Sequence, residues 1–143
     1  MSTDDQSDSL AVMHVIQAET NAFWMKSYDD WANCWLHAPE IRMMGWWARG
    51  GINITEGWQA LSDKMRHLMQ DNPIPNPQSA QVRRENINIR VTERMAWVTF
   101  DQYGVDTNEP DMDMPGLSHE TRILEKHDGA WKLVYVCWLL AGE

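Results

Sequence analysis

A carboxylate interrupts the apolar face of the helix that we expect over residues 9–25. On a helical wheel Val12, Ile16 and Phe23 share one face, and Glu19 lies in the middle of it. Burial in apolar surroundings raises the pKa of a carboxylate towards the range in which it can act as a general acid or base. Glu19 is therefore the strongest candidate for chemistry. The alternative is a structural carboxylate, bonded to an arginine or to the backbone of a neighbouring strand.

A second pair of candidates lies on the strand expected over residues 95–103. Trp97, Asp101 and Tyr103 alternate onto one face of this strand. We expect that face to line a pocket that begins apolar and becomes polar towards its mouth. Asp101 would then act as a base and Tyr103 as a hydrogen-bond donor. The alternative is an aspartate at a strand end that is solvated or paired with Arg122.

A histidine on the next expected strand, residues 117–127, offers a partner for that aspartate. If His119 faces the cavity, it pairs with Asp101 across the sheet and forms a dyad that titrates near neutral pH. The alternative is a histidine that is simply exposed. Glu120 and Arg122 share the opposite face of the strand, where an ion pair is the expected role.

Nine tryptophans in so short a chain suggest more than a bulky core. Their rings are large and their indole N–H groups need partners when buried, so we expect some of them to line a cavity. The alternative for each of them is a place in the core. The residues expected to bind a substrate are Phe23, Tyr28, Trp31, Trp46, Trp47, Trp58, Trp97 and Tyr135.

The sequence holds no convincing metal or cofactor motif. Asp111 and Asp113 stand in an acidic loop without a histidine at ligand spacing. His119 and Glu120 do not begin a zinc-protease motif, because Ile123 stands where that motif needs histidine. No glycine-rich phosphate or dinucleotide fingerprint is present. We therefore expect neither a metal nor a cofactor.

Charge and composition narrow the class of protein. Seven of the nine net negative charges come from residues 1–9 and 104–117, so the rest of the chain is nearly neutral and lacks the basic face that nucleic acid requires. Cys34 and Cys137 lie far apart, and the first residues are polar and acidic rather than signal-like. No apolar run approaches the roughly 20 residues of a membrane span. We expect a cytoplasmic protein with reduced thiols and no membrane partner.

The 143 residues fit one domain, which we place at residues 9–143 after a disordered acidic tail, residues 1–8. Periodicity and turn signals predict an α+β fold, in which three N-terminal helices cover one face of a strongly curved antiparallel sheet. The expected helices are 9–25, 27–38 and 55–70, and the expected strands are 41–47, 51–54, 81–92, 95–103, 117–127 and 131–140.

The order of these elements resembles the nuclear transport factor 2-like superfamily, in its SnoaL-like and ketosteroid-isomerase-like branches. The resemblance lies in the opening helix pair, in Thr55–Leu61 (TEGWQAL) and in the hairpin Thr121–Val136 (TRILEKHDGAWKLVYV), whose Asp-Gly turn is followed by tryptophan. It implies a cone-shaped barrel with a deep pocket and a homodimer packed through the outer face of the sheet.

The same resemblance bears on two positions. Glu19 falls where ketosteroid isomerases carry a helix-borne tyrosine that polarises the substrate carbonyl, and a protonated glutamate could donate similarly. The catalytic base of those isomerases would fall around residues 43–45, where no carboxylate stands. Trp46 and Trp47 follow instead, so we do not expect steroid isomerisation by that residue.

We expect a cofactor-independent acid–base enzyme, a lyase or dehydratase or else an isomerase, acting on a small hydrophobic, aromatic compound such as a phenolic dimer. Glu19, Asp101 and His119 would move the protons. One alternative is a non-catalytic small-molecule-binding or assembly module, which requires Glu19 and Asp101 to be ion-paired and inaccessible. The other is a polyketide cyclase.

Overall fold

The computed structural model describes residues 3–77, 81–104, 109 and 116–141, and the side chains from residue 6 onward. The acidic loop that we expected at 104–116 lies mostly outside these residues. The helices are α1 (Thr3–Trp24), α2 (Tyr28–Asn33) and α3 (Trp58–Asp71). The strands are β1 (Arg42–Trp47), β2 (Gly51–Glu56), β3 (Arg83–Val91), β4 (Met95–Gly104), β5 (Gly116–His127) and β6 (Ala130–Leu140).

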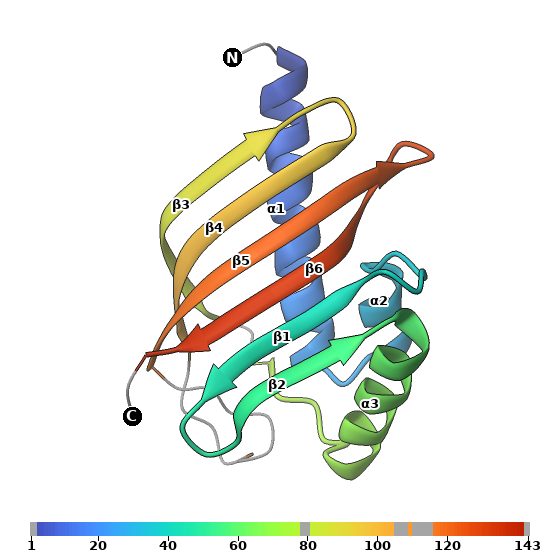
Figure 1. Cartoon of the computed structure of the whole chain (residues 1–143), viewed down its shortest axis with the longest axis vertical. Helices are drawn as coiled ribbons and strands as arrows, with labels where there is room; N and C mark the ends of the chain where they lie inside the picture. Colours follow the sequence, from blue (N-terminus) through green and yellow to red (C-terminus); the bar gives the residue numbers. More distant parts are fainter. Residues whose placement is uncertain (1–2, 78–80, 105–108, 110–115, 142–143) are drawn as a thin grey trace.

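The six strands form one curved sheet in the order β2-β1-β6-β5-β4-β3 (Figure 1). The predicted α+β fold is confirmed, with one difference in the sheet. Strand β1 runs parallel to β6, whereas the other four neighbouring pairs are antiparallel, so the sheet is mixed. The parallel pair arises because α3 and β3–β5 intervene between β1 and β6 in the chain.

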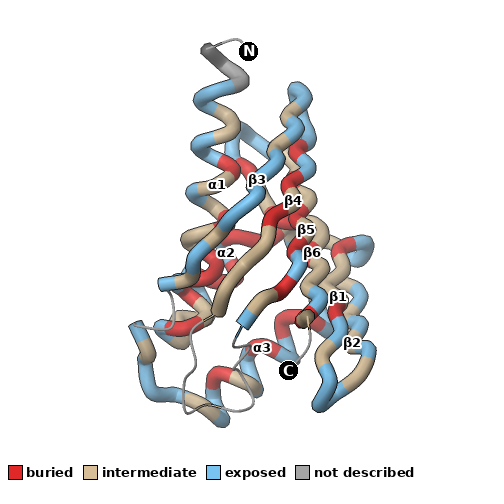
Figure 2. The backbone as a smooth tube through the Cα atoms, turned by 90° about the vertical axis from the view of Figure 1, so that its left-hand side faces the viewer, coloured by how far each residue is buried: buried red, intermediate tan, exposed pale blue. Residues whose placement is uncertain are grey.

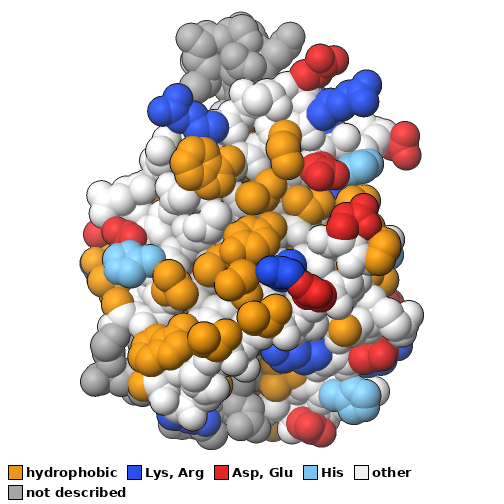
Figure 3. Space-filling model, in the orientation of Figure 1, with side chains coloured by type: hydrophobic (Ala, Val, Ile, Leu, Met, Phe, Trp, Pro, Cys, Tyr) orange, Lys and Arg blue, Asp and Glu red, His pale blue; other side chains and the backbone are white. Residues whose placement is uncertain are grey.

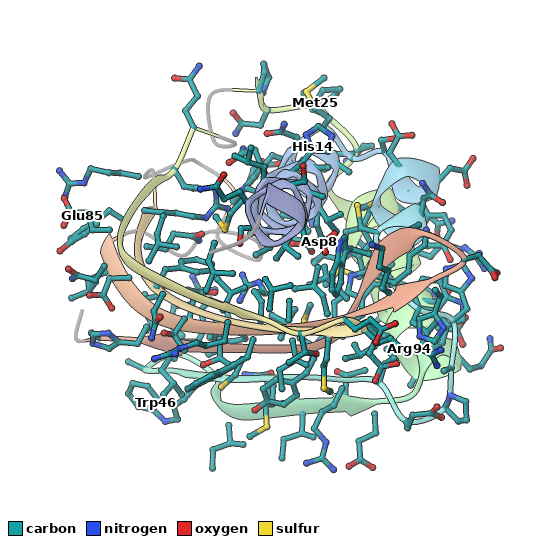
Figure 4. All side chains as sticks on the ribbon, turned by 90° about the horizontal axis from the view of Figure 1, so that it is seen from above. Asp8, His14, Met25, Trp46, Glu85 and Arg94 are labelled. Carbon is teal, nitrogen blue, oxygen red and sulfur yellow. The ribbon has the colours of Figure 1, made fainter. Side chains whose placement is uncertain are left out.

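Helix α1 crosses the inner, concave face of the sheet, as the view from above shows (Figure 4). Its apolar stripe is the one that periodicity predicts: Val12 and Ile16 are fully buried, and Glu19 is buried with them. Helices α2 and α3 lie at the β1–β2 end of the sheet (Figure 1). Buried residues lie on the strands and on all three helices (Figure 2), so the core is the space that the helices close against the sheet.

The first helix begins earlier than the sequence indicates. It starts at Thr3 rather than near Ser9, so residues 3–8, which we expected in a disordered tail, belong to α1. The carboxylate of Asp8 accepts hydrogen bonds from Lys126 Nζ and Trp131 Nε1, each at 3.2 Å. These bonds tie the start of the helix to the β5–β6 hairpin.

The inner face of β4 is the opposite of the face that we expected. Ala96, Val98 and Phe100 are buried against α1, and Phe100 is 3% exposed, whereas Trp97 is 49% exposed on the outer face. Both faces of this strand carry apolar side chains, so alternation alone does not distinguish them. Ala96, Val98 and Phe100 belong to the same buried core as Val12 and Ile16 of α1.

Candidate functional site

Charged side chains gather on the inner face of the sheet beneath α1. Strand register places Arg84 beside Gln102 and Phe100 beside Glu120, with Arg122 two residues further along β5. Glu19 approaches them from α1. We call these residues the inner-face cluster: Glu19, Arg84, Phe100, Gln102, Glu120 and Arg122.

Glu19 is the acid of this cluster and is 8% exposed. Its Oε2 accepts a hydrogen bond of 3.0 Å from Trp31 Nε1. Burial raises the pKa of Glu19, and this outweighs the lowering effects of Arg122, Trp31 and Arg84. Among the described residues, no basic side chain is within ion-pairing distance of Glu19. The carboxyl group is therefore desolvated without a direct counter-ion.

Glu120 and Arg122 form a buried ion pair, as the sequence predicts. Glu120 Oε1 lies 2.7 Å from Arg122 Nη1, and both side chains are almost fully buried. The same Nη1 also donates to the carbonyl oxygen of Thr121 at 3.2 Å. The other carboxylate oxygen, Glu120 Oε2, and Arg122 Nε have no protein partner. The pair is therefore only half satisfied, which is uncommon for buried charges.

Arg84 extends from β3 into the less buried end of the cluster. Its Nη1 donates to the side-chain oxygen of Gln17, and its Nη2 donates to Thr20 Oγ1 at 2.8 Å. Burial and the nearby charge of Arg122 lower the pKa of Arg84 to about 10, so the guanidinium stays charged at neutral pH. Its Nε, like that of Arg122, is buried without a partner.

The ring of Phe100 lies close to both guanidinium groups. The Cζ atoms of Arg84 and Arg122 are each 5.3 Å from the ring centroid of Phe100. This distance is within the range of a cation–π contact. Phe100 is therefore the residue of the cluster that both arginines contact.

Asp101 and His119 do pair, but on the outer face of the sheet. Asp101 Oδ1 lies 2.8 Å from His119 Nδ1, and Asn86 Nδ2 donates to Asp101 Oδ2 at 2.8 Å. These hydrogen bonds lower the pKa of Asp101. The side chain of His119 is 56% exposed.

Tyr103 shares the outer face with this pair, under the guanidinium of Arg83, whose Cζ is 4.1 Å from the ring centroid. Glu19 lies on the other side of the sheet. The three groups that we expected to move protons together, Glu19, Asp101 and His119, therefore do not meet in one site.

The aromatic residues expected around a substrate are dispersed. Trp31 stacks on Trp58 with ring centroids 5.6 Å apart, and Trp58 stacks on His37 at 3.9 Å. Tyr28 lies beside this stack, its hydroxyl bonded to Ser62. These rings come from α2, α3 and the segment between α2 and β1, and Trp31 also donates a hydrogen bond to Glu19 of the inner-face cluster.

The remaining expected rings lie elsewhere. Trp46, Trp97 and Tyr135 are on the outer face of the sheet, where Trp46 is exposed. Trp47 meets Trp138 edge-on, with centroids 6.3 Å apart. Phe23 meets Trp24 edge-on at the end of α1, at 5.2 Å. The binding roles predicted for these rings stay predictions, but the rings do not form a single wall.

Sequence reasoning missed Arg84 and Gln102. Arg83 and Arg84 are adjacent in β3, and nothing in their types shows which of them faces inward. The signal that could have found Arg84 is the inward face of β4: once Phe100 is placed inside, its neighbour Gln102 and the paired residue Arg84 follow from the register. An error of one face on β4 therefore hid both residues.

Within the described residues, no group of three or more histidine, cysteine or acidic side chains is arranged to hold a metal ion. The described helices also include none that is both long and apolar enough to cross a membrane.

Solved structures with this fold come from several bacteria. An NTF2-like protein of unknown function from Shewanella oneidensis matches with a TM-score of 0.66 and 13% identity, covering 92% of this chain and 98% of its own. A cystatin-like-fold protein of unknown function from Nostoc punctiforme matches at 0.68 and 16%, covering 95% and 92%. A candidate dehydratase of the NTF2-like family from Streptomyces avermitilis matches at 0.68 and 12%, covering 97% and 99%. These likenesses show the fold.

The comparison of sequences is more specific about the family. A search of curated proteins finds no significant match. The model of the SnoaL-like domain matches residues 12–137, which span α1 to β6 and include every residue of the inner-face cluster. The chain therefore belongs to the SnoaL-like domain family, within the NTF2-like superfamily.

Proposed function

We propose that the protein is a cofactor-independent acid–base enzyme, a lyase or dehydratase, that acts on a small hydrophobic, aromatic compound at the inner-face cluster. The observation that carries this proposal is Glu19, a buried carboxyl group with a raised pKa and no direct counter-ion. A desolvated carboxyl group with a raised pKa is suited to accept a proton from a substrate and to return it.

A dehydration illustrates how the cluster would work. Ionised Glu19 takes a proton from the carbon next to a substrate carbonyl group, and negative charge develops on the carbonyl oxygen. The electron pair then forms the carbon–carbon double bond and expels the hydroxyl group on the next carbon. Glu19, now protonated, returns its proton to that hydroxyl group, which leaves as water.

The two arginines suit the charge that develops in such a reaction. Fixed cations in a site with little water stabilise an anionic transition state more strongly than the same groups in water. Arg122 is held by Glu120 at 2.7 Å, and Arg84 is held by Gln17 and Thr20. Glu120 is therefore a positioning residue for Arg122.

Apolar neighbours of Glu19 favour a hydrophobic substrate. Ile16 and Val98 are fully buried in the same core, Phe100 is itself part of the cluster, and Trp31 donates to Glu19. The likeness to the candidate dehydratase from Streptomyces avermitilis adds support for dehydration over isomerisation. Aromatic rings pack well against one another, so the rings of Phe100 and Trp31 favour an aromatic substrate, for example a phenolic dimer.

Turnover of a panel of hydroxylated aromatic carbonyl compounds and phenolic dimers, followed by mass spectrometry, tests the proposal. Glu19→Gln should lower kcat by at least about a hundredfold, because the amide cannot exchange a proton. Asp101→Asn is the matched variant on the outer face of the sheet. Retained turnover in this variant supports a site on the inner face. No turnover by the unmodified protein across the panel, or equal turnover by Glu19→Gln, would contradict the proposal.

A non-catalytic binding module is the second candidate, and one observation favours it. Glu19 is 8% exposed, close to the burial that this candidate requires, but it is not ion-paired with any described residue. Asp101 is paired with His119 but remains partly exposed. Tight binding of the panel compounds without turnover would support the binding module over the enzyme.

We further propose that two copies of the chain pair through the outer face of the sheet. Apolar side chains form a diagonal band across that face (Figure 3). Isolated proteins rarely expose such contiguous apolar surface without a partner. The exposed residues of this band are Trp46, Ile52, Ile54, Met95, Trp97 and Leu139.

A further inference from the structure

We propose that Arg84 and Arg122 bind the carboxylate group of a small aromatic monocarboxylate, with the aromatic body of that ligand against Phe100 and the apolar residues of α1. The description of this ligand as a substrate rests on the proposed function; the binding site itself does not.

Unpartnered donors on both guanidinium groups point to an acceptor. The Nε atoms of Arg84 and Arg122 are buried and donate to no atom of the described residues. Buried arginine donors normally have partners, because an unmade hydrogen bond costs the desolvation of the group without return. The planar guanidinium matches the two oxygens of a carboxylate, which can accept from more than one N–H at once.

The balance of charge in the cluster also favours an anion. Arg122 is paired with Glu120 at 2.7 Å. Arg84 is held by neutral groups, Gln17 and Thr20, and no carboxylate in the described part of the chain is in direct contact with it. Glu19, whose pKa burial raises, is the other acid nearby. A buried positive charge without a counter-ion is costly, and an incoming anion would supply one.

The surroundings favour one negative charge rather than two. Glu19 and Glu120 both lie near the arginines and would repel a phosphate dianion more strongly than a carboxylate. The neighbouring side chains are apolar: Ile16, Val98 and Phe100 are all buried. A ligand with a single acidic group and a hydrophobic body fits this combination.

The β3–β4 side is the more exposed side of the cluster. Arg84 and Gln102 are half-buried, whereas Glu120 and Arg122 are buried more deeply. A carboxylate would therefore meet Arg84 first and Arg122 further inside. The side-chain oxygen of Gln102 is on the same side of the cluster and is buried without a donor among the described residues.

Binding of 3-phenylpropionate and of its neutral counterpart 3-phenylpropionamide, measured by isothermal titration calorimetry on the full chain, tests the inference. We expect the carboxylate to bind at least about tenfold more tightly than the amide, which is the scale of one charge-assisted hydrogen bond. Arg84→Gln should remove this preference. The control is Arg83→Gln, since the adjacent Arg83 faces outward and should leave the preference intact.

A spectroscopic measurement on the unmodified protein avoids the risk that a variant fails to fold. The Nε–H resonances of Arg84 and Arg122 should shift when 3-phenylpropionate is added and stay in place when the amide is added. Equal affinities for the two compounds, unmoved Nε–H resonances, or a loss in Arg83→Gln as large as in Arg84→Gln would overturn the inference.

These experiments distinguish a failure of the carboxylate site from a failure of the proposed enzyme activity. Carboxylate preference without turnover of any panel compound supports this site and contradicts the enzyme. Turnover of neutral compounds by the unmodified protein, with no preference for the carboxylate, supports the enzyme and contradicts this site.

Discussion

At the scale of single residues, the pKa of Glu19 links stability to pH. The unfolded chain keeps the ordinary value of 4.5, and burial raises the folded value above it. Between these two values the folded protein binds more protons than the unfolded chain, so stability falls as pH rises. We predict that Glu19→Gln flattens the free energy of unfolding above pH 4.5, measured by urea denaturation at a series of pH values.

The control for this prediction is Glu93→Gln, at an exposed turn between β3 and β4, which should keep the slope of the unmodified protein. Asp101 has the opposite sign, because its pKa is lowered, and its contribution is lost as pH falls from 3.8. The two residues therefore act in different pH ranges. A slope in Glu19→Gln equal to that of the unmodified protein would show that Glu19 is not perturbed.

Because Glu120 and Arg122 form a buried ion pair, we predict that the effects of replacing them on the free energy of unfolding are strongly non-additive. Glu120→Gln leaves the buried guanidinium without its carboxylate and should lower the free energy of unfolding by about 3–5 kcal/mol. Replacing both residues by methionine should cost much less, because no charge is left buried. Chemical denaturation of the single and double variants measures this coupling, and additive losses would contradict it.

At the scale of elements, substitutions on the two faces of β4 test which face of this strand is buried. Val98→Asp places a charge in the core beneath α1 and should abolish cooperative unfolding, since Val98 is fully buried. Trp97→Asp, one residue earlier and on the exposed face, should retain a cooperative transition. Thermal unfolding followed by circular dichroism compares the two, and the reverse order of effects would contradict the assignment.

The positions of the helices and strands were largely predictable from the sequence, but the buried face of each strand and the pairing of distant strands were not. Helix α3, the hairpin β5–β6 and the buried stripe of α1 follow from periodicity and from the Asp128-Gly129 turn. The parallel pairing of β1 with β6 does not, because no local pattern specifies which distant strand lies alongside. A register shift between Ile123 and Leu124, opposite β6, shows how a bulge changes which residues face inward.

At the scale of the whole molecule, the exposed apolar band predicts an oligomer that a single substitution disrupts. Ile52→Glu, at a position 73% exposed on β2, should convert a dimer to a monomer in light scattering after size-exclusion chromatography. The control is Ile74→Glu, which is 75% exposed but outside the band. A monomeric unmodified protein, or equal effects of the two substitutions, would contradict pairing through this face.

The family could be predicted from the chain as a whole, but the site could not. Order of elements and the terminal hairpin spread over the full length, and they match the SnoaL-like domain over residues 12–137. The inner-face cluster joins Glu19 on α1, Arg84 on β3 and Arg122 on β5. Only Glu19 is marked locally, by its place in an apolar stripe. The arginines depend on strand faces and register, which the sequence leaves open.

The central claim is that Glu19 is a desolvated carboxyl group poised for proton exchange. A titration of its side-chain carboxyl carbon by 13C nuclear magnetic resonance, assigned by comparison with Glu19→Gln, measures this directly. We predict a pKa clearly above 4.5, because burial outweighs the attraction of Arg122 and Arg84. A pKa at or below 4.5 would show a fully compensated, structural carboxylate and would contradict the proposed function.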